Sequence, residues 1–130
     1  MRWNWIIAVV LSSLLMTSAA TGKTTVRDFS GTGSTTTNDF VVEGPWLLDW
    51  RLDGDYENLI ALDISLIDSR TGRHVGRVLH TKFRGNGVKL FEEGGVYRLR
   101  ISSTLARWRV RIQQITPEEA EQYTPRKPRD

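Results

Sequence analysis

Residues 106–115 read ARWRVRIQQI, with arginine and apolar residues at alternate positions. Successive side chains of a β-strand point to opposite sides, so this period of two predicts a strand over residues 107–112 with one buried and one solvent-facing side. The buried side would carry Trp108, Val110 and Ile112, and the solvent-facing side Arg107, Arg109 and Arg111.

Residues 96–101, VYRLRI, show the same alternation just upstream, with apolar side chains on one side and two arginines on the other. The five residues that separate the two strands, 102–106, are a suitable length for a hairpin connection. We therefore predict that the strands pair, so that one sheet face carries five arginines: Arg98, Arg100, Arg107, Arg109 and Arg111.

Shorter alternating segments precede this pair, and glycine, proline and aspartate mark the turns between them. Gly76 interrupts one segment and suggests a bulge there. The predicted strands cover residues 40–43, 46–53, 59–67, 74–79 and 88–91, with a hairpin loop over 68–73 and a turn at 85–87. The predicted inward residues are Phe40, Val42, Trp46, Leu48, Trp50, Leu52, Leu62, Ile64 and Leu66.

No part of this span has a sustained helical period. Short strands at regular spacing, separated by turn signals, are typical of an all-β sandwich or jelly roll. We predict one antiparallel β-sandwich domain of about seven to eight short strands over residues 39–115, followed by a short C-terminal helix.

The N-terminus predicts a secretory signal peptide over residues 1–20. A cationic start is followed by an apolar run over residues 5–16, and the small residues Ser18 and Ala20 fit a cleavage site after Ala20. The run is shorter than the ~20 apolar residues that a membrane-spanning helix needs. We therefore expect no transmembrane span in the mature chain.

The segments that flank the sandwich are polar. Residues 21–38 are rich in threonine, serine and glycine, which predicts a flexible leader with one edge strand at most. Thr116, Pro117 and Glu119 form the N-cap, first-turn proline and capping-box glutamate of a short helix that ends before Pro125. The rest of residues 116–130 is predicted to be a disordered tail.

Export and the absence of cysteine together favour a bacterial periplasm or the surrounding medium as the location. The formal net charge is only +3, but the charges are unevenly distributed along the chain. Residues 28–69 carry a net charge of −8 and residues 70–111 carry +9. This asymmetry is the most unusual feature of the sequence.

The arginine face has two interpretations. In the first, Glu43, Asp49 and Asp53 on earlier strands neutralise the arginines, in pairs worth about 0 to 1 kcal/mol each. In the second, the arginines bind an anionic envelope component, such as a lipid headgroup or an acidic polysaccharide, or an acidic patch on another exported protein. Guanidinium groups hold phosphates and carboxylates in bidentate pairs, which lysine cannot do. No nucleic-acid recognition motif is present, so we expect no nucleic-acid partner.

The tryptophans of the mature chain fall at inward positions, which predicts that they pack in the core. An alternative hypothesis is that Trp46 and Trp50 line a groove and stack on a carbohydrate or another small ligand.

Candidate catalytic and metal-binding residues give weak signals. The loop DGDYEN, 53–58, concentrates oxygen ligands, but its spacing differs from that of the twelve-residue calcium loop. His74 and His80 would share a strand face, yet no third zinc ligand is evident. The chain lacks a cysteine nucleophile, a Gly-x-Ser-x-Gly elbow and a phosphate-cradling loop. We predict that the protein is not an enzyme and needs no metal or cofactor.

Several signatures along the chain resemble those of small secreted bacterial β-sandwich modules. They are Phe40-x-Val42-x-Gly44-Pro45-Trp46, Asp68-x-x-Thr71-Gly72, Gly95-x-Tyr97-x-Leu99-x-Ile101 and Trp108-x-Val110-x-Ile112. The layout over residues 38–114 is also distantly similar to that of pre-peptidase C-terminal domains. The resemblance implies an accessory or binding role without a catalytic centre.

From the sequence we expect an exported, non-enzymatic binding module that uses the arginine face. The alternatives are a carbohydrate or small-ligand module and an accessory structural domain with no ligand of its own. The oligomeric state is left open.

Overall fold

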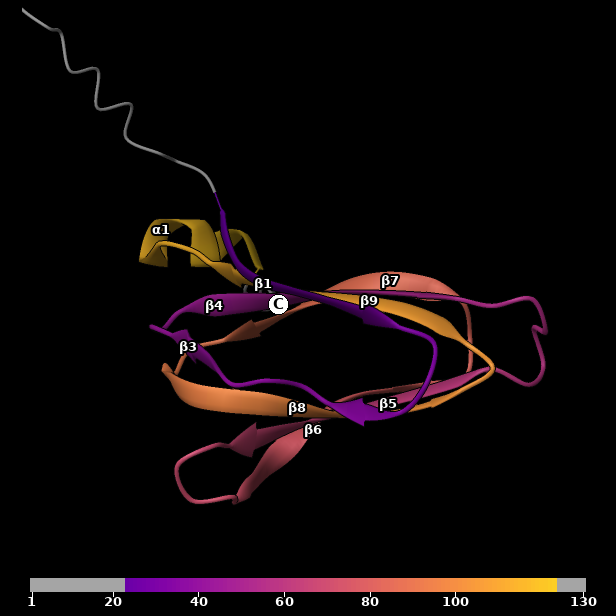
Figure 1. The fold of residues 1–130 in the computed structure, drawn as a ribbon. Helices are drawn as coiled ribbons and strands as arrows, with labels where there is room; N and C mark the ends of the chain where they lie inside the picture. The colour runs from indigo at the N-terminus through magenta and orange to yellow at the C-terminus, as the bar shows by residue number, and fades with distance from the viewer. Residues whose placement is uncertain (1–22, 124–130) are drawn as a thin grey trace, which may run out of the picture.

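The computed structural model describes residues 23–123, and within them the chain forms nine strands and a short helix (Figure 1). The predicted signal peptide and residues 124–130 lie outside the described residues. The strands are β1 (Thr24–Gly31), β2 (Thr35–Thr36), β3 (Phe40–Val42), β4 (Trp46–Asp53), β5 (Ala61–Asp68), β6 (His74–Thr81), β7 (Gly85–Phe91), β8 (Gly95–Thr104) and β9 (Arg107–Gln114). The helix α1 (Pro117–Ala120) is followed by a 3-10 turn, Glu121–Tyr123.

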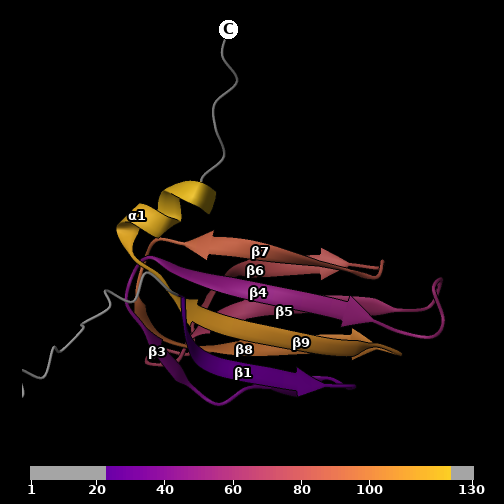
Figure 2. The same ribbon diagram turned by 90° about the horizontal axis from the view of Figure 1, so that it is seen from above.

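The strands form two antiparallel sheets packed face to face, which confirms the predicted sandwich (Figure 1). Sheet A has the order β1-β9-β4-β7, which Figure 2 shows from above. Sheet B has the order β2-β8-β5-β6, and β3 pairs with the same edge of β8 as β2. Thr37 fills the gap between β2 and β3, because its hydroxyl accepts a hydrogen bond of 2.9 Å from the Leu99 N–H.

The core lies between the sheets and is formed by the predicted inward residues of both. Trp46 is fully buried, and its ring stacks on Phe91 with 4.3 Å between centroids. The rings of Phe40 and Tyr97 each lie 5.7 Å from that of Trp46. The predicted core faces of β5, β8 and β9 are confirmed: Leu62, Ile64, Leu66, Tyr97, Leu99, Ile101, Trp108, Val110 and Ile112 are all buried.

The predicted pairing of residues 96–101 with 107–112 is wrong. β8 lies in sheet B and β9 in sheet A, so the link at Leu105 and Ala106 crosses from one sheet to the other. Leu105 adopts a positive φ of 48° in this link. Both strands still direct their apolar side chains into the core, but their arginines point away from each other on opposite sides of the sandwich.

Two smaller predictions also need correction. Residues 21–38, predicted to be a flexible leader with one edge strand at most, contain two edge strands: β1 pairs with β9 in sheet A and β2 pairs with β8 in sheet B, so this stretch belongs to the sandwich. The predicted turn at 85–87 is the start of β7. Gly87 suits this strand because the Trp50 ring occupies the place of a side chain: a Cβ at Gly87 would lie 2.8 Å from the indole nitrogen of Trp50.

The C-terminal helix begins as predicted. The Thr116 hydroxyl accepts a 3.2 Å hydrogen bond from the Glu119 N–H, and Glu119 reaches back to the Thr116 N–H to complete a capping box. Figure 1 shows α1 above the start of β4, on the outer side of sheet A. Leu47 points to that side and is nevertheless fully buried. The helix therefore covers one end of the outer face of sheet A.

Candidate anion-binding faces

The crossing between β8 and β9 divides the predicted arginine face into two. Arg107, Arg109 and Arg111 lie on the outer face of sheet A, and Arg98 and Arg100 lie on the outer face of sheet B. The structure therefore does not bring the five predicted residues together, and each face has to be considered separately.

Arg107 is held by two aspartates at the end of β4. Its guanidinium lies 3.0 Å from Asp53 Oδ2 and donates hydrogen bonds of 3.1 and 3.2 Å to the two carboxylate oxygens of Asp55. These contacts lower the pKa of both aspartates and raise the pKa of Arg107. The predicted partner Asp53 is confirmed.

Arg109 and Arg111 share Asp28 of β1. Arg109 holds the carboxylate in a bidentate pair, with N–O distances of 3.1 and 2.6 Å, and Arg111 Nε lies 3.4 Å from Asp28 Oδ2. The hydrogen bond from Arg109 lowers the pKa of Asp28. Carboxylates of the chain itself therefore pair with all three arginines of sheet A, as the first interpretation predicts. Of its three named partners only Asp53 takes part: among the described residues Glu43 and Asp49 form no ion pair, and Asp28 and Asp55 pair with the arginines instead.

The acid dependence of unfolding tests the Asp28–Arg109 pair. The pKa of Asp28 is lower in the folded protein than its ordinary value. The pair therefore stabilises the fold fully at pH values above the ordinary pKa of aspartate, and this stabilisation is lost as the pH falls through the lower pKa of the folded state. We expect Arg109→Gln to lower the urea midpoint of unfolding at neutral pH. The difference between the midpoints of this variant and the wild type should become smaller in acid. Arg51→Gln, on the same face, is the control: the difference between its urea midpoint and that of the wild type should not depend on pH. A gap for Arg109→Gln that persists at the lowest pH would contradict the pair.

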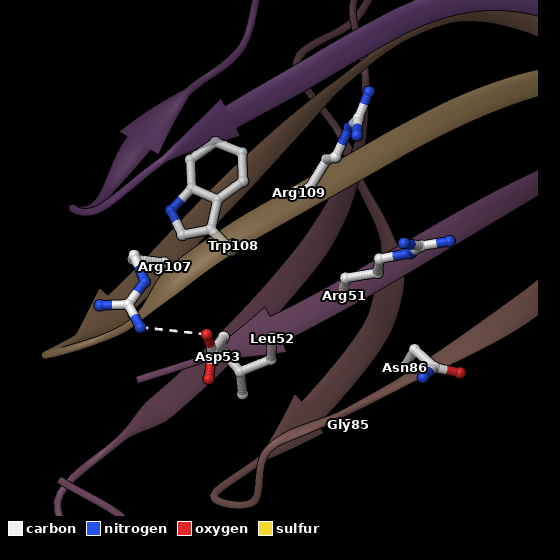
Figure 3. A pocket seen from close by; sticks show the side chains of 8 residues that line it. All are labelled: Arg51, Leu52, Asp53, Gly85, Asn86, Arg107, Trp108 and Arg109. Carbon is white, nitrogen blue, oxygen red and sulfur yellow. Dashed lines mark hydrogen bonds and ion pairs between the residues drawn. The ribbon is translucent and has the colours of Figure 1, made fainter. Parts of the chain in front are cut away.

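A groove of about 500 Å³ lies at the end of sheet A where β4 ends and β7 and β9 begin (Figure 3). Arg51 lies directly opposite Arg109 on one side and Asn86 on the other, and it has no acidic partner among the described residues. In Figure 3 the side chain of Arg107 turns toward Asp53, and those of Arg51 and Arg109 extend in different directions. The three guanidinium groups do not converge on one point in the groove.

The acidic loop at 53–58 pairs with arginines. Arg107 contacts Asp53 and Asp55, and Arg84 lies 3.5 Å from Glu57 and 3.8 Å from Asp53. Within residues 23–123, no three histidine, aspartate or glutamate side chains gather in an arrangement that could hold a metal ion.

The outer face of sheet B has a different charge pattern. Strand register places its side chains in three rows that cross β8, β5 and β6. Because neighbouring strands lie ~4.8 Å apart, each row spans about 10 Å. The rows are Arg98, Ile67 and His74; Arg100, Ser65 and Arg77; and Ser102, Asp63 and His80. We call these nine residues the Arg98 face.

Asp63 is the one carboxylate among the nine residues of the Arg98 face, and it already contacts two of them. Its Oδ2 lies 3.4 Å from Arg77 Nε and 3.1 Å from His80 Nδ1. Arg98 and Arg100 have no acidic partner among the described residues, and Arg100 is exposed. With both histidines neutral, three arginines and one aspartate give the face a net charge of +2.

The three tryptophans within residues 23–123 are buried or partly buried. Trp46 is fully buried and donates a 2.9 Å hydrogen bond to the Glu93 carbonyl, so its predicted alternative role in ligand stacking is wrong. Trp108 is 4% exposed and donates to the Gly33 carbonyl. Trp50 is partly buried and packs under Gly87 and against the core.

Sequence reasoning missed three residues that define these faces. Asp28 lies in the segment predicted to be a leader, where a bulge at Val26 breaks the two-residue period, so that Val26 and Phe29 both pack against the core. Arg77 was missed because two bulges in β6 change its register against β5. Arg51 is a lone cation in an acidic stretch, and only pairing with β9 places it beside Arg109.

The described part of the chain contains no helix with the length and apolar character needed to cross a membrane. Comparison with known proteins finds no family model that matches the chain and no curated protein with significant similarity to it.

Proposed function

We propose that the protein is an exported, non-enzymatic binding module that contacts an anionic component of the cell envelope through the Arg98 face. The observation that carries this proposal is the contrast between the two sheets. Carboxylates of the chain pair with Arg107, Arg109 and Arg111 on sheet A, whereas no carboxylate of residues 23–123 pairs with Arg98 or Arg100.

The geometry of β8 supports this role. Arg98 and Arg100 are two residues apart on one strand, so their Cα atoms lie about 7 Å apart and their side chains point the same way. Ser65 stands beside Arg100 on β5 and adds a hydroxyl donor. Guanidinium groups at this spacing can each hold a separate phosphate or carboxylate, which suits a partner that carries repeated anionic groups.

An exposed valine lies next to the arginines of β8. Val41 on β3 lies opposite Val96 on β8, next to Arg98 on the same outer side, and Val41 is 66% exposed. No described helix or strand lies over this side, whereas α1 covers part of the opposite one (Figure 1). The partner would therefore meet an open, curved sheet face with cations and an exposed valine.

Binding of the purified protein to two classes of anionic surface tests the proposal. We expect binding to phosphatidylglycerol vesicles or to alginate, no binding to phosphatidylcholine vesicles, and a steep loss of affinity from about 50 to about 200 mM salt. Vesicle binding alone would identify lipid phosphates as the target, and alginate binding alone would identify sugar carboxylates. Binding to neither would overturn the proposal.

A charge-matched pair of variants locates the binding face. Arg98→Gln with Arg100→Gln should weaken binding about 30-fold, if each cation near an anionic surface contributes about 1 kcal/mol. Arg27→Gln with Arg51→Gln removes the same charge from exposed positions elsewhere and should change affinity less than threefold. Equal losses in the two variants would show that net charge alone drives the binding and would contradict a role for this face.

A further inference from the structure

A small pocket lies between two loops at one end of the sandwich. Residues 54–60 join β4 to β5, and residues 82–84 join β6 to β7. Figures 1 and 2 show the first of these loops extending beyond the ends of the strands. The pocket has a volume of about 360 Å³ and is lined by Glu57, Asn58, Phe83 and Arg84. None of these four residues belongs to the Arg98 face, so the pocket is a separate candidate site.

Phe83 is the most exposed large apolar side chain among the described residues. It stands in a polar stretch, TKFRGN over residues 81–86, and is 77% exposed. Its backbone is nevertheless held, because the Thr81 hydroxyl accepts a 3.2 Å hydrogen bond from the Phe83 N–H. An aromatic ring that is fixed at its backbone and lies outside the core is available as a stacking surface for a ligand.

The other lining residues supply polar groups. The side-chain amide of Asn58 offers two donors and an acceptor, and it forms no hydrogen bond with another residue of the described chain. The Arg84 guanidinium lies 3.5 Å from Glu57 and 3.8 Å from Asp53, so it ties the two loops together. A 2.9 Å backbone hydrogen bond closes the turn over residues 56–59. The pocket is therefore formed before a ligand arrives, which lowers the cost of binding.

The charges around the pocket cancel. Three acidic and three basic side chains stand at this end of the sandwich, namely Asp53, Asp55, Glu57, Lys82, Arg84 and Arg107. A charged ligand would gain no net attraction here, and it would compete with the Arg84–Glu57 pair. Three of the four lining side chains are polar, which does not suit an acyl chain. Within residues 23–123 no metal-binding cluster is present.

A neutral sugar matches this combination of groups. One face of a sugar ring carries C–H groups that pack on an aromatic ring, and its hydroxyls both donate hydrogen bonds and accept them. We infer that the pocket binds a neutral carbohydrate, which stacks on Phe83 and forms hydrogen bonds with the three polar side chains of the lining. The stacking residue thus differs from Trp46 and Trp50, which the sequence suggested for this role. The inference goes beyond the proposed function, because it concerns another surface and an uncharged ligand.

An NMR titration of the purified protein with four neutral disaccharides tests the inference. Maltose, cellobiose, lactose and N,N′-diacetylchitobiose differ in linkage and in the orientation and substitution of their hydroxyls. We expect at least one of them to shift the side-chain amide signals of Asn58 and the backbone signals of Phe83 and Arg84. The expected Kd is about 1 mM, because one stacked ring and a few exposed hydrogen bonds leave a small surplus over the cost of binding.

The response to salt and the absence of any response are also informative. Because the ligand is uncharged, its Kd should change less than about twofold between about 50 and about 500 mM salt. A steep loss of affinity with salt would contradict a neutral ligand site. If none of the four sugars shifts these signals at about 50 mM, far above the expected Kd, the inference is wrong.

A matched set of variants locates the site. Phe83→Ala should weaken sugar binding about tenfold or more, whereas Phe83→Tyr keeps an aromatic ring and should stay within about threefold of wild type. Tyr56→Ala is the control, because Tyr56 is 59% exposed on the neighbouring loop and does not line the pocket, and it should change the Kd less than about twofold. All three side chains replaced are exposed, so the urea midpoints should stay close to wild type and separate lost binding from lost folding.

The outcomes separate this inference from the proposed function. Full affinity in Phe83→Ala, or equal losses in Phe83→Ala and Tyr56→Ala, would overturn the assignment of the sugar to this pocket. Arg98→Gln with Arg100→Gln should leave the sugar affinity unchanged, and Phe83→Ala should leave the binding of vesicles or alginate unchanged. A sugar affinity that falls in the double arginine variant would contradict a separate site.

Discussion

Replacing Trp46 with alanine is expected to destabilise the fold by about 3 to 5 kcal/mol, a large part of the 5 to 15 kcal/mol that typically separates folded from unfolded domains. Trp46 is fully buried and contacts three other aromatic rings. Its removal leaves a cavity between the sheets, and the Glu93 carbonyl loses the 2.9 Å hydrogen bond from the indole and keeps only the 3.2 Å one from the Tyr97 hydroxyl. The expected result is a much lower urea midpoint.

Circular dichroism should follow this unfolding, because the substitution removes a fluorophore. Tyr56→Ala is the matched control, since Tyr56 is 59% exposed and its loss should change the free energy of unfolding by less than about 0.5 kcal/mol. A Trp46→Ala midpoint close to that of Tyr56→Ala would show that the core is not arranged around this ring.

Gly44→Ala is expected to cost about 3 kcal/mol or more, although it adds a single methyl group. A Cβ at this position would lie 1.9 Å from the Glu92 carbonyl oxygen and 3.2 Å from the Gly94 nitrogen. Both obstacles are backbone atoms, so neither can rotate away as a side chain would. The turn between β3 and β4 and the turn between β7 and β8 would have to move apart.

Gly33→Ala provides the control for this experiment. Nothing lies within 4 Å of a Cβ built at Gly33, and its φ is not positive, so alanine should be tolerated within about 0.5 kcal/mol. Urea unfolding of the two variants beside wild type makes the comparison. If Gly44→Ala unfolds at the wild-type midpoint, the two turns do not pack backbone against backbone.

The faces of single strands could be predicted from sequence, because side-chain alternation is a local property. Trp108, Val110 and Ile112 point inward as their spacing predicts. The pairing of strands could not be predicted in the same way. A hairpin and a link that crosses between facing sheets both bury the apolar sides of two successive strands, so the alternation in 96–101 and 107–112 is compatible with either arrangement.

The candidate site shows the same limit. The separation of charge along the chain correctly indicated that acidic residues of the first half meet arginines of the second, as Asp53 and Arg107 do. It could not show which arginines stay without partners, because that depends on whether a strand lies in sheet A or sheet B. Glycine is typical of turns, yet Gly87 lies inside β7, because the ring of Trp50, far away in the sequence, fills the space that a side chain would need.

The alternation of the chain between the two sheets also bears on how the domain reaches its native state. Of the eight connections between successive strands in the described region, six pass from one sheet to the other, and β5 and β6 form the single hairpin. Few native contacts can therefore form between segments close in the chain, and loops must close over long distances before pairing stabilises them. Refolding should accordingly fall in the slow range of two-state domains, milliseconds to seconds, with the β5–β6 hairpin as the only ready-made local nucleus.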